Sequence, residues 1–234
     1  MPYIPRSTYQ TRWPFTNAHV NTIFPNLFRR IDDLPYQRET ISTPDGDFLD
    51  LDWMRNGNDR LLIGMHGLEG DTQRPYLKGM FQYFQARGWD VMGVNFRSCG
   101  GRVNQRLRMY NMGESHDLAL VMEHVLQLNY SSIVLTGFSL GGGVVLKFMG
   151  ESGRYLPDSV RGAVAFSVPI HLTSANEAIA RRQNFIYMLR FMRTLNVKVR
   201  EKAAQFPGYL ELEGKMPKDF AGFDGRFTAP IHGY

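Results

Sequence analysis

Short apolar runs alternate with helical stripes through the middle of this chain. Runs that are apolar at almost every position predict strands buried on both faces of a sheet, over residues 60–66, 89–96, 132–137 and 160–168. Between them, apolar residues recur three and four positions apart, which predicts helices over residues 75–87, 114–128 and 140–150. Buried strands separated by helices indicate an α/β fold with a mostly parallel sheet and flanking helices.

Two further strands are predicted before this region. Residues 37–42 and 48–54 have the composition of strands, and Pro44-Asp45-Gly46 supplies the turn between them. Residues 1–35 are rich in proline, aromatic residues and arginine without a regular period, which predicts an irregular arm packed on the core. The expected anchors of this arm are Trp13, Phe15, Ile23, Phe24, Leu27 and Phe28.

The pattern changes again after residue 170. Residues 171–205 have no strand signal, and apolar residues at helical spacing predict a cap helix: Phe185, Met188, Leu189, Met192 and Leu195. Residues 206–234 contain no strand-like run either. We therefore predict an N-terminal arm over 1–35, an α/β core over 36–170, and a helical cap with the start of a return to the core over 171–234.

Composition places the 234-residue chain among ordinary globular proteins. Hydrophobic residues make up 43% and charged residues 21%, which argues against global disorder. No apolar run reaches the roughly 18 residues of a membrane-spanning helix, and the N-terminus has no apolar signal core. One cysteine, Cys99, excludes an internal disulfide framework, so we expect a cytoplasmic protein. The net charge of +5 is too small to indicate nucleic-acid binding.

The segment Gly137-Phe138-Ser139-Leu140-Gly141 matches the pattern G-x-S-x-G. It follows a predicted buried strand and opens a predicted helix, which is the setting of a serine nucleophile elbow. The flanking glycines permit the tight turn, and the helix N-terminus favours negative charge beside the serine. We predict that Ser139 is a catalytic nucleophile. The alternative is a glycine-rich turn in which this serine only caps the helix.

A second segment, Met65-His66-Gly67-Leu68, ends a predicted strand two βα units earlier. The main-chain N–H after such a His-Gly pair can join the N–H that follows the nucleophile, and together they bind an oxyanion. This assigns Leu68 and Leu140 as main-chain oxyanion donors. His66 and Gly67 are predicted to be substrate-binding loop residues, and the alternative is an ordinary loop histidine beside a turn glycine.

Seven blocks of sequence, spread over nearly the whole chain, carry a family resemblance. They are 21–25, 45–53, 66–70, 74–80, 95–100, 137–142 and 229–233. On these blocks the chain resembles the YheT-like esterases of the α/β-hydrolase superfamily. The resemblance implies an α/β-hydrolase fold, a small-molecule ester substrate hydrolysed at its carboxylic ester bond, and Ser139 as the nucleophile. Members of this family continue with two more strands that carry the acid and the histidine of the triad, and no matching positions precede Tyr234.

The strand over 160–168 is apolar, and without a further neighbour it leaves the sheet incomplete at its C-terminal edge. We therefore predict a truncated or frame-interrupted hydrolase whose catalysis is impaired. Three histidines are candidates for a substitute base, and each also suits a capping or packing role: His116, His171 and His232. Asp224 matches the acid only by chain order.

A carboxylesterase-type serine hydrolase is the leading prediction. The alternatives are acyl transfer by the same elbow, and a non-catalytic remnant or binding module that keeps the pocket. The basic residues and apolar stripe of the cap favour an apolar face packed on the core beneath a solvated basic face, and the alternative is peripheral lipid contact through the basic cap. Cys99 is expected to be a small buried residue, and Glu69 a solvated loop residue. Motifs for zinc proteases, P-loop enzymes and dinucleotide enzymes are absent, so no metal and no cofactor are expected.

Overall fold

The computed structural model describes residues 6–233, and the chain divides between Asp33 and Leu34 into two compact units. In the smaller unit, helix α1 (Ala18–Phe28) begins where the Asn17 side chain accepts hydrogen bonds from two main-chain N–H groups. The prediction of an irregular segment is therefore wrong for these residues, because a capped helix forms here without a clear apolar stripe. Packing of the arm on the core stays a prediction.

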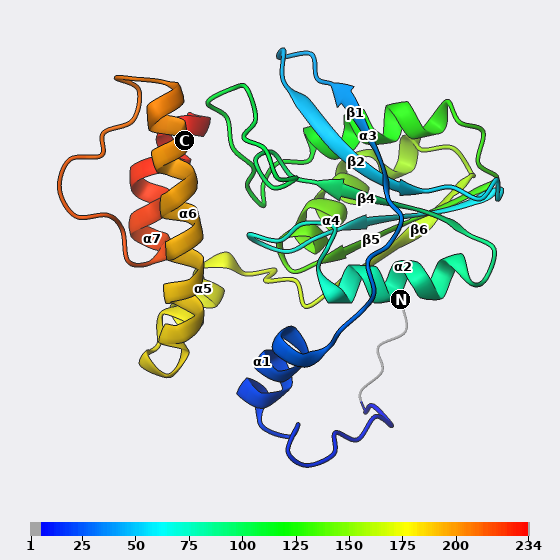
Figure 1. The fold of residues 1–234 in the computed structure, drawn as a ribbon, viewed down its shortest axis with the longest axis horizontal. Coiled ribbons are helices and arrows are strands. Elements are labelled where there is room, and N and C mark those ends of the chain that lie inside the picture. The colour runs from blue at the N-terminus through cyan, green and yellow to red at the C-terminus, as the bar shows by residue number, and fades with distance from the viewer. Residues whose placement is uncertain (1–5, 234) are drawn as a thin grey trace. The chain divides into compact units, whose positions relative to one another are not determined.

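The larger unit is built on one six-stranded sheet in the order β1-β2-β4-β3-β5-β6 (Figure 1). Its strands are β1 (Gln37–Ser42), β2 (Phe48–Met54), β3 (Arg60–Met65), β4 (Asp90–Asn95), β5 (Ser132–Phe138) and β6 (Val160–Phe166). The pairs β3–β4, β3–β5 and β5–β6 are parallel, whereas β2 runs antiparallel to both β1 and β4. The predicted α/β fold with a mostly parallel sheet is confirmed.

The register of the parallel strands sets the position of the loops that follow them. Met65, the last residue of β3, pairs with Gly137 of β5, and Gly137 pairs with Ala165 of β6. The carboxyl ends of these three strands therefore meet at one edge of the sheet. The His66 loop and the turn at Ser139 leave the sheet side by side at that edge.

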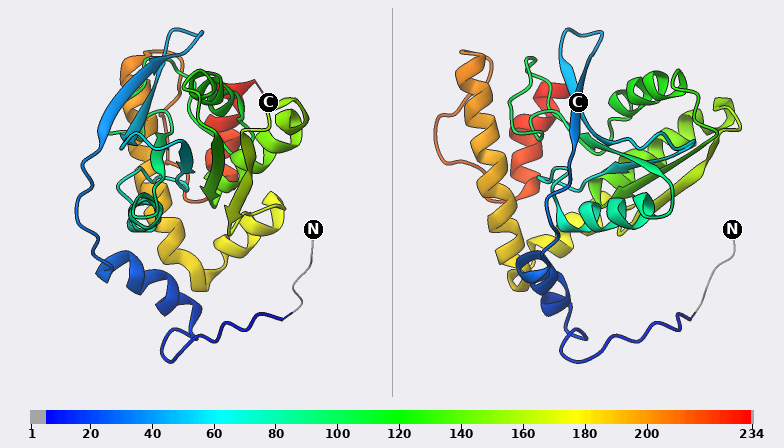
Figure 2. Two further views of the ribbon diagram at one scale, coloured as in Figure 1. Left: turned by 90° about the vertical axis from the view of Figure 1, so that its right-hand side faces the viewer. Right: turned by 45° about the vertical axis from the view of Figure 1, so that its right-hand side comes forward.

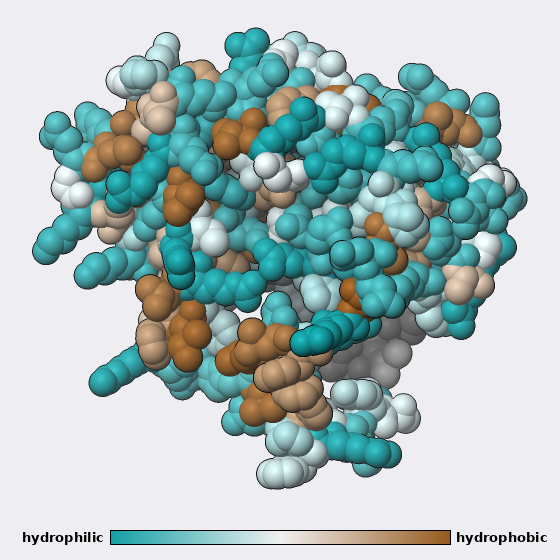
Figure 3. Space-filling model, viewed as in Figure 1, coloured by the Kyte–Doolittle hydropathy of each residue, from teal (hydrophilic) through white to brown (hydrophobic). Residues whose placement is uncertain are grey.

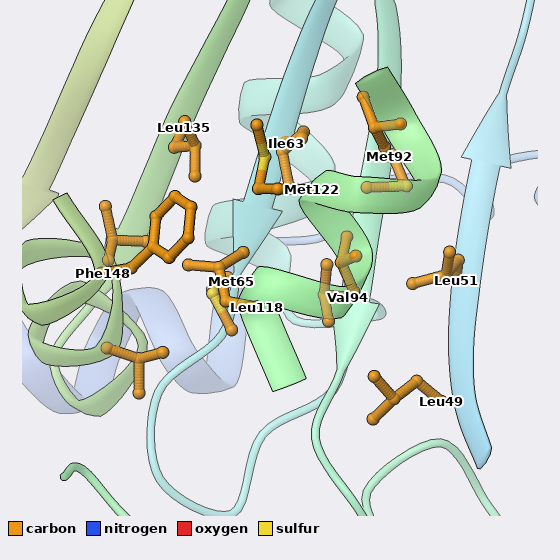
Figure 4. Close-up of a cluster of buried hydrophobic side chains, with 14 of the residues drawn as sticks. Leu49, Leu51, Ile63, Met65, Met92, Val94, Leu118, Met122, Leu135 and Phe148 are labelled. Atoms are coloured by element: carbon orange, nitrogen blue, oxygen red, sulfur yellow. The ribbon is translucent and has the colours of Figure 1, made fainter. Parts of the chain in front are cut away.

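Helices cover both faces of the sheet, as the sequence predicts. Helix α2 (Pro75–Gln85) buries Leu77 and Phe81 against one face. Helices α3 (His116–Leu126) and α4 (Leu140–Ser152) cover the other face. The core between the sheet and these two helices is drawn in Figure 4 and includes Leu51, Ile63, Met65, Val94, Leu118, Met122, Leu135 and Phe148. Each of these side chains contributes about 2 kcal/mol by leaving water.

After β6 the described chain forms only helices and loops. The helices are α5 (Leu172–Ala180), a 3-10 turn (Arg182–Asn184), α6 (Phe185–Gln205), α7 (Phe220–Phe223), a π-helical turn (Asp224–Thr228) and α8 (Ala229–His232). Helix α6 and the segment from α7 to α8 lie side by side (Figures 1 and 2), and share an apolar cluster that includes Met192, Leu195, Phe223 and Phe227. The predicted helical cap is confirmed.

Strand β6 forms one edge of the sheet in the part of the chain that the structure describes. Val164 is 49% exposed and Phe166 is 39% exposed along it, whereas the central strands β3 and β4 are almost wholly buried. The apolar residues of β6 therefore have only partial cover. The prediction that the chain is a shortened hydrolase stays a prediction.

Candidate active site

Ser139 occupies the sharp turn between β5 and α4. Its backbone has φ 53° and ψ −117°, a strained conformation for a residue with a side chain. A Cβ atom added to Gly137 would lie 2.4 Å from the carbonyl oxygen of Gly141, and one added to Gly141 would lie 2.4 Å from that of His66. Only glycine fits at either position, so both glycines of the motif serve the turn that presents Ser139.

The loop after β3 lies directly against this turn. A Cβ atom added to Gly67 would lie 3.4 Å from the Cβ atom of Ser139. Among residues 6–233, the main-chain N–H of Leu68 donates no hydrogen bond to another protein group. Leu140 is the first residue of α4, where main-chain N–H groups lack an acceptor within the helix. The structure thus brings Ser139, Leu68 and Leu140 to the wall of one cavity.

His66 is fully buried below this loop. The main-chain N–H of Phe96 donates to Nε2 of His66 at 3.2 Å, so Nδ1 carries the proton and donates to the carbonyl oxygen of Gly67 at 2.8 Å. Burial lowers the pKa of His66 to about 3, which keeps the ring neutral. The predicted contact of His66 and Gly67 with substrate stays a prediction, and the burial of the ring favours a role in holding the loop.

Glu69, the next residue of this loop after Leu68, is held from two sides. Its main-chain N–H donates to the Tyr110 hydroxyl at 2.9 Å, and that hydroxyl donates to Oε1 of Glu69 at 2.6 Å. Lys198 of α6 donates to the same oxygen at 2.8 Å. The Glu69 side chain is only 6% exposed, so the expectation of a solvated loop residue is wrong. Its partner Lys198 lies 129 residues away in sequence, and no local signal marks that pair.

Cys99 lies beside this ion pair and is nearly buried, as the sequence predicts. Lys198 Nζ is 3.0 Å from its sulfur atom. Burial raises the pKa of the Cys99 thiol in spite of this neighbouring cation. A thiol with a raised pKa is a weak nucleophile, which leaves Ser139 as the nucleophile candidate at this edge.

A cavity of about 590 Å³ lies between the sheet edge and the cap. Its walls come from the loops after β3, β5 and β6, the segment 109–113, and the cap helices. Apolar side chains dominate the lining, among them Leu68, Met109, Ile179, Phe191, Phe223 and Phe227. Concave apolar sites with a few polar groups are typical of small-molecule binding, and Ser139 is one of those polar groups. The structure gathers no cluster of His, Cys, Asp or Glu suited to a metal ion in residues 6–233.

Comparison with known proteins agrees with this geometry. The family model described as "Serine aminopeptidase, S33" matches residues 57–211. The chain belongs to this family of α/β-hydrolases. It is 32% identical over 229 residues to "Putative esterase YheT" of Escherichia coli (strain K12), which covers 94% of this chain and 66% of that protein. It is 26% identical over 245 residues to "Phospholipase ABHD3" of Mus musculus, over 100% of this chain and 59% of that protein.

The chain spans about two thirds or less of the length of these relatives. Its fold is also that of the esterase Pf2001 of Pyrococcus furiosus, with a TM-score of 0.52 and 23% identity. That similarity covers 74% of this chain and 62% of the other. At this level of identity the similarity concerns the fold alone.

The histidines considered as a substitute base lie in different places. His116 is exposed, and its Nδ1 is 2.5 Å from Oε1 of Glu114. His171 is also exposed, and its side chain caps the N-terminus of α5. Of the histidines in residues 6–233, His232 is the one that lines the cavity with Ser139. Asn111 donates to Nδ1 of His232 at 3.3 Å, and burial lowers the pKa of this ring.

Asp224 also lines the cavity, and its carboxylate accepts a hydrogen bond from the Thr228 hydroxyl at 2.7 Å. Burial raises the pKa of Asp224. The walls of the cavity therefore contain a serine, an aspartate and a histidine in the chain order that the fold uses. The printed sequence gives little reason to choose His232 over the other histidines, because its place in the cavity depends on the packing of α7 and α8 against α6.

Proposed function

We propose that this protein is a serine hydrolase that cleaves carboxylic esters through Ser139. The observation that carries the proposal is the strained backbone of Ser139 at the end of a central strand, with the Gly67 loop packed against its side chain. Such a turn keeps the hydroxyl accessible at the edge of the sheet. A strained conformation persists only where the surrounding structure enforces it, which favours a functional role.

In this proposal Ser139 Oγ bonds to the ester carbonyl carbon and gives its proton to a base. The main-chain N–H groups of Leu68 and Leu140 stabilise the oxyanion. The C–O bond to the alcohol then breaks, the alcohol takes the proton, and water later releases the acid from the acyl-enzyme. The apolar cavity supports an ester whose acyl group is apolar.

His232 is the histidine we propose to test first as the base, with Asp224, which lines the same cavity, as the candidate acid. The lowered pKa of His232 favours the neutral ring that a general base requires. The competing arrangement is a base that another group supplies in place of His232. Without any base, elbow enzymes retain about 10³–10⁴-fold catalysis over water.

The test is hydrolysis of a series of nitrophenyl esters by the full chain. We expect Ser139→Ala to abolish turnover, His232→Asn to lower it at least about tenfold, and the matched control His116→Asn to leave it unchanged. Equal rates for the chain and Ser139→Ala would refute the proposal. Transfer of the acyl group to an added alcohol in preference to water would instead identify an acyltransferase.

A further inference from the structure

Helix α6 carries apolar side chains on two neighbouring faces in its first half. Met188, Met192 and Leu195 are buried against the other cap helices. On the outward face beside them, Phe185 is 59% exposed, Ile186 is 55% exposed and Leu189 is 64% exposed. Figure 3 shows brown, hydrophobic surface over the lower end of α6. Large exposed apolar side chains that lie together need a partner, because isolated ones alone are ordinary on a protein surface.

The same face carries positive charge. At 100° per residue, Arg190 and Arg193 project from the side of α6 that bears Phe185, Ile186 and Leu189. Arg182 lies in the 3-10 turn directly before the helix and is exposed. In the part of the chain that the structure describes, none of these arginines forms an ion pair. No acidic residue occurs between Arg181 and Arg200. We refer to these six residues, three arginines and three apolar side chains, as the basic apolar face.

This combination fits one kind of partner better than a protein surface. Apolar side chains flanked by arginines and free of acidic residues are typical of helices that lie in the interface of an anionic bilayer. The arginines bind lipid phosphates, while the apolar side chains enter the headgroup region. A helix face that only contacts water would need no apolar side chains here. Packing on the core does not explain them either, because the buried side of α6 already provides that contact.

The face also lies close to the way into the cavity. Leu172 of α5 is 52% exposed and lines the cavity at the same time, and Ile179 at the other end of α5 lines it too. Helix α5 directly precedes α6 and packs against it. An apolar molecule that leaves a bilayer under the basic apolar face would therefore meet the cavity wall within one helix length.

We propose that the basic apolar face of α6 docks the protein on an anionic lipid bilayer. This is peripheral docking, since no helix in residues 6–233 has the length and hydropathy to cross a bilayer. The proposal does not depend on ester hydrolysis, because it concerns the outer side of the cap and not Ser139.

The test is flotation of the full chain with vesicles. One set contains phosphatidylcholine alone, and the other contains about one third phosphatidylserine. We expect binding to the anionic vesicles, weakened by salt, and little binding to the neutral ones. Replacing the three arginines by glutamine should weaken binding about a hundredfold, since each basic residue near the surface contributes about fivefold. Replacing Leu189 by serine should weaken it about tenfold or more.

Matched controls lie elsewhere on the larger unit. Leu146→Ser changes an exposed leucine of α4, and Arg154→Gln removes an arginine that follows α4. Both should bind vesicles like the unchanged chain, and near-identical circular dichroism of all variants shows that they fold. Failure of the unchanged chain to float with anionic vesicles would overturn the proposal. So would a concentration-dependent dimer that Leu189→Ser abolishes without any effect on flotation.

Discussion

Lys198 Nζ lies 2.8 Å from Glu69 Oε1, so an ion pair joins cap helix α6 to the residue that directly follows Leu68. Both side chains are largely buried, at 15% and 6% exposure. Although burial opposes the charge, the neighbouring Cys99 and Glu69 raise the pKa of Lys198, so it stays protonated. The pair therefore links the position of the cap to the loop that carries the proposed oxyanion donor.

Breaking this ion pair should destabilise the protein. Lys198→Met leaves the Glu69 carboxylate buried with only the Tyr110 hydroxyl as a donor, at a cost of about 3 kcal/mol. The free energy of unfolding from urea titrations measures this loss. The control Lys147→Met removes an exposed pair with Glu151 on α4 and should cost less than about 1 kcal/mol. Equal losses in the two variants would contradict the special role of Lys198.

The tight turn at Ser139 predicts opposite effects for two glycines of α4. Gly141→Ala places a methyl group 2.4 Å from the carbonyl oxygen of His66 and should destabilise the protein by about 1–3 kcal/mol. Gly150→Ala meets no atom within 4 Å and should stabilise it by up to about 1 kcal/mol. Thermal unfolding of both variants measures the difference. A Gly141→Ala variant as stable as Gly150→Ala would contradict the close approach of the two loops.

Burial of neutral His66 predicts a loss of stability in acid. Its pKa in the folded protein is about 3, below the value of 6.5 expected in the unfolded chain. The unfolded state thus binds the proton first as the pH falls, and stability decreases from about pH 6.5 downward by about 1.4 kcal/mol per pH unit. Above pH 6.5 this contribution is fully present.

Comparison of two histidine variants isolates this effect. His66→Gln removes the titrating group. Between pH 6.5 and pH 4, the free energy of unfolding of this variant should therefore fall by about 3 kcal/mol less than that of the unchanged chain. His116→Gln changes an exposed ring and serves as the control for the loss of a histidine from the surface. If all three proteins show the same pH dependence, His66 is not the buried neutral group described here.

The strands of the sheet could be predicted from sequence because their signals are local. Continuous apolar runs define β3, β4 and β5, and a Pro-Asp-Gly turn defines the hairpin of β1 and β2. The serine turn could be predicted for the same reason, since its glycines and the flanking strand and helix are contiguous. Helix α1 was missed because its start depends on one capping side chain, Asn17.

The remainder of the site depends on contacts between distant segments. The pairing of Lys198 with Glu69 and the position of Tyr110 arise only when the cap packs on the sheet edge. The same packing brings His232 and Asp224 to the cavity. No spacing in the sequence encodes these distances, so the sequence predicts the serine turn and the loop after β3 but not the side chains that the cap brings to them.

Labelling by a fluorophosphonate probe tests the central claim most directly, because the probe reacts only with an activated serine. Mass spectrometry of the full chain should place the phosphonyl group on Ser139, and Ser139→Ala should take up none, whereas the control Ser174→Ala should be labelled like the unchanged chain. Absence of labelling under conditions that label a known serine esterase would identify a non-catalytic protein that retains the fold. Equal labelling of Ser139→Ala would contradict the assignment of the nucleophile.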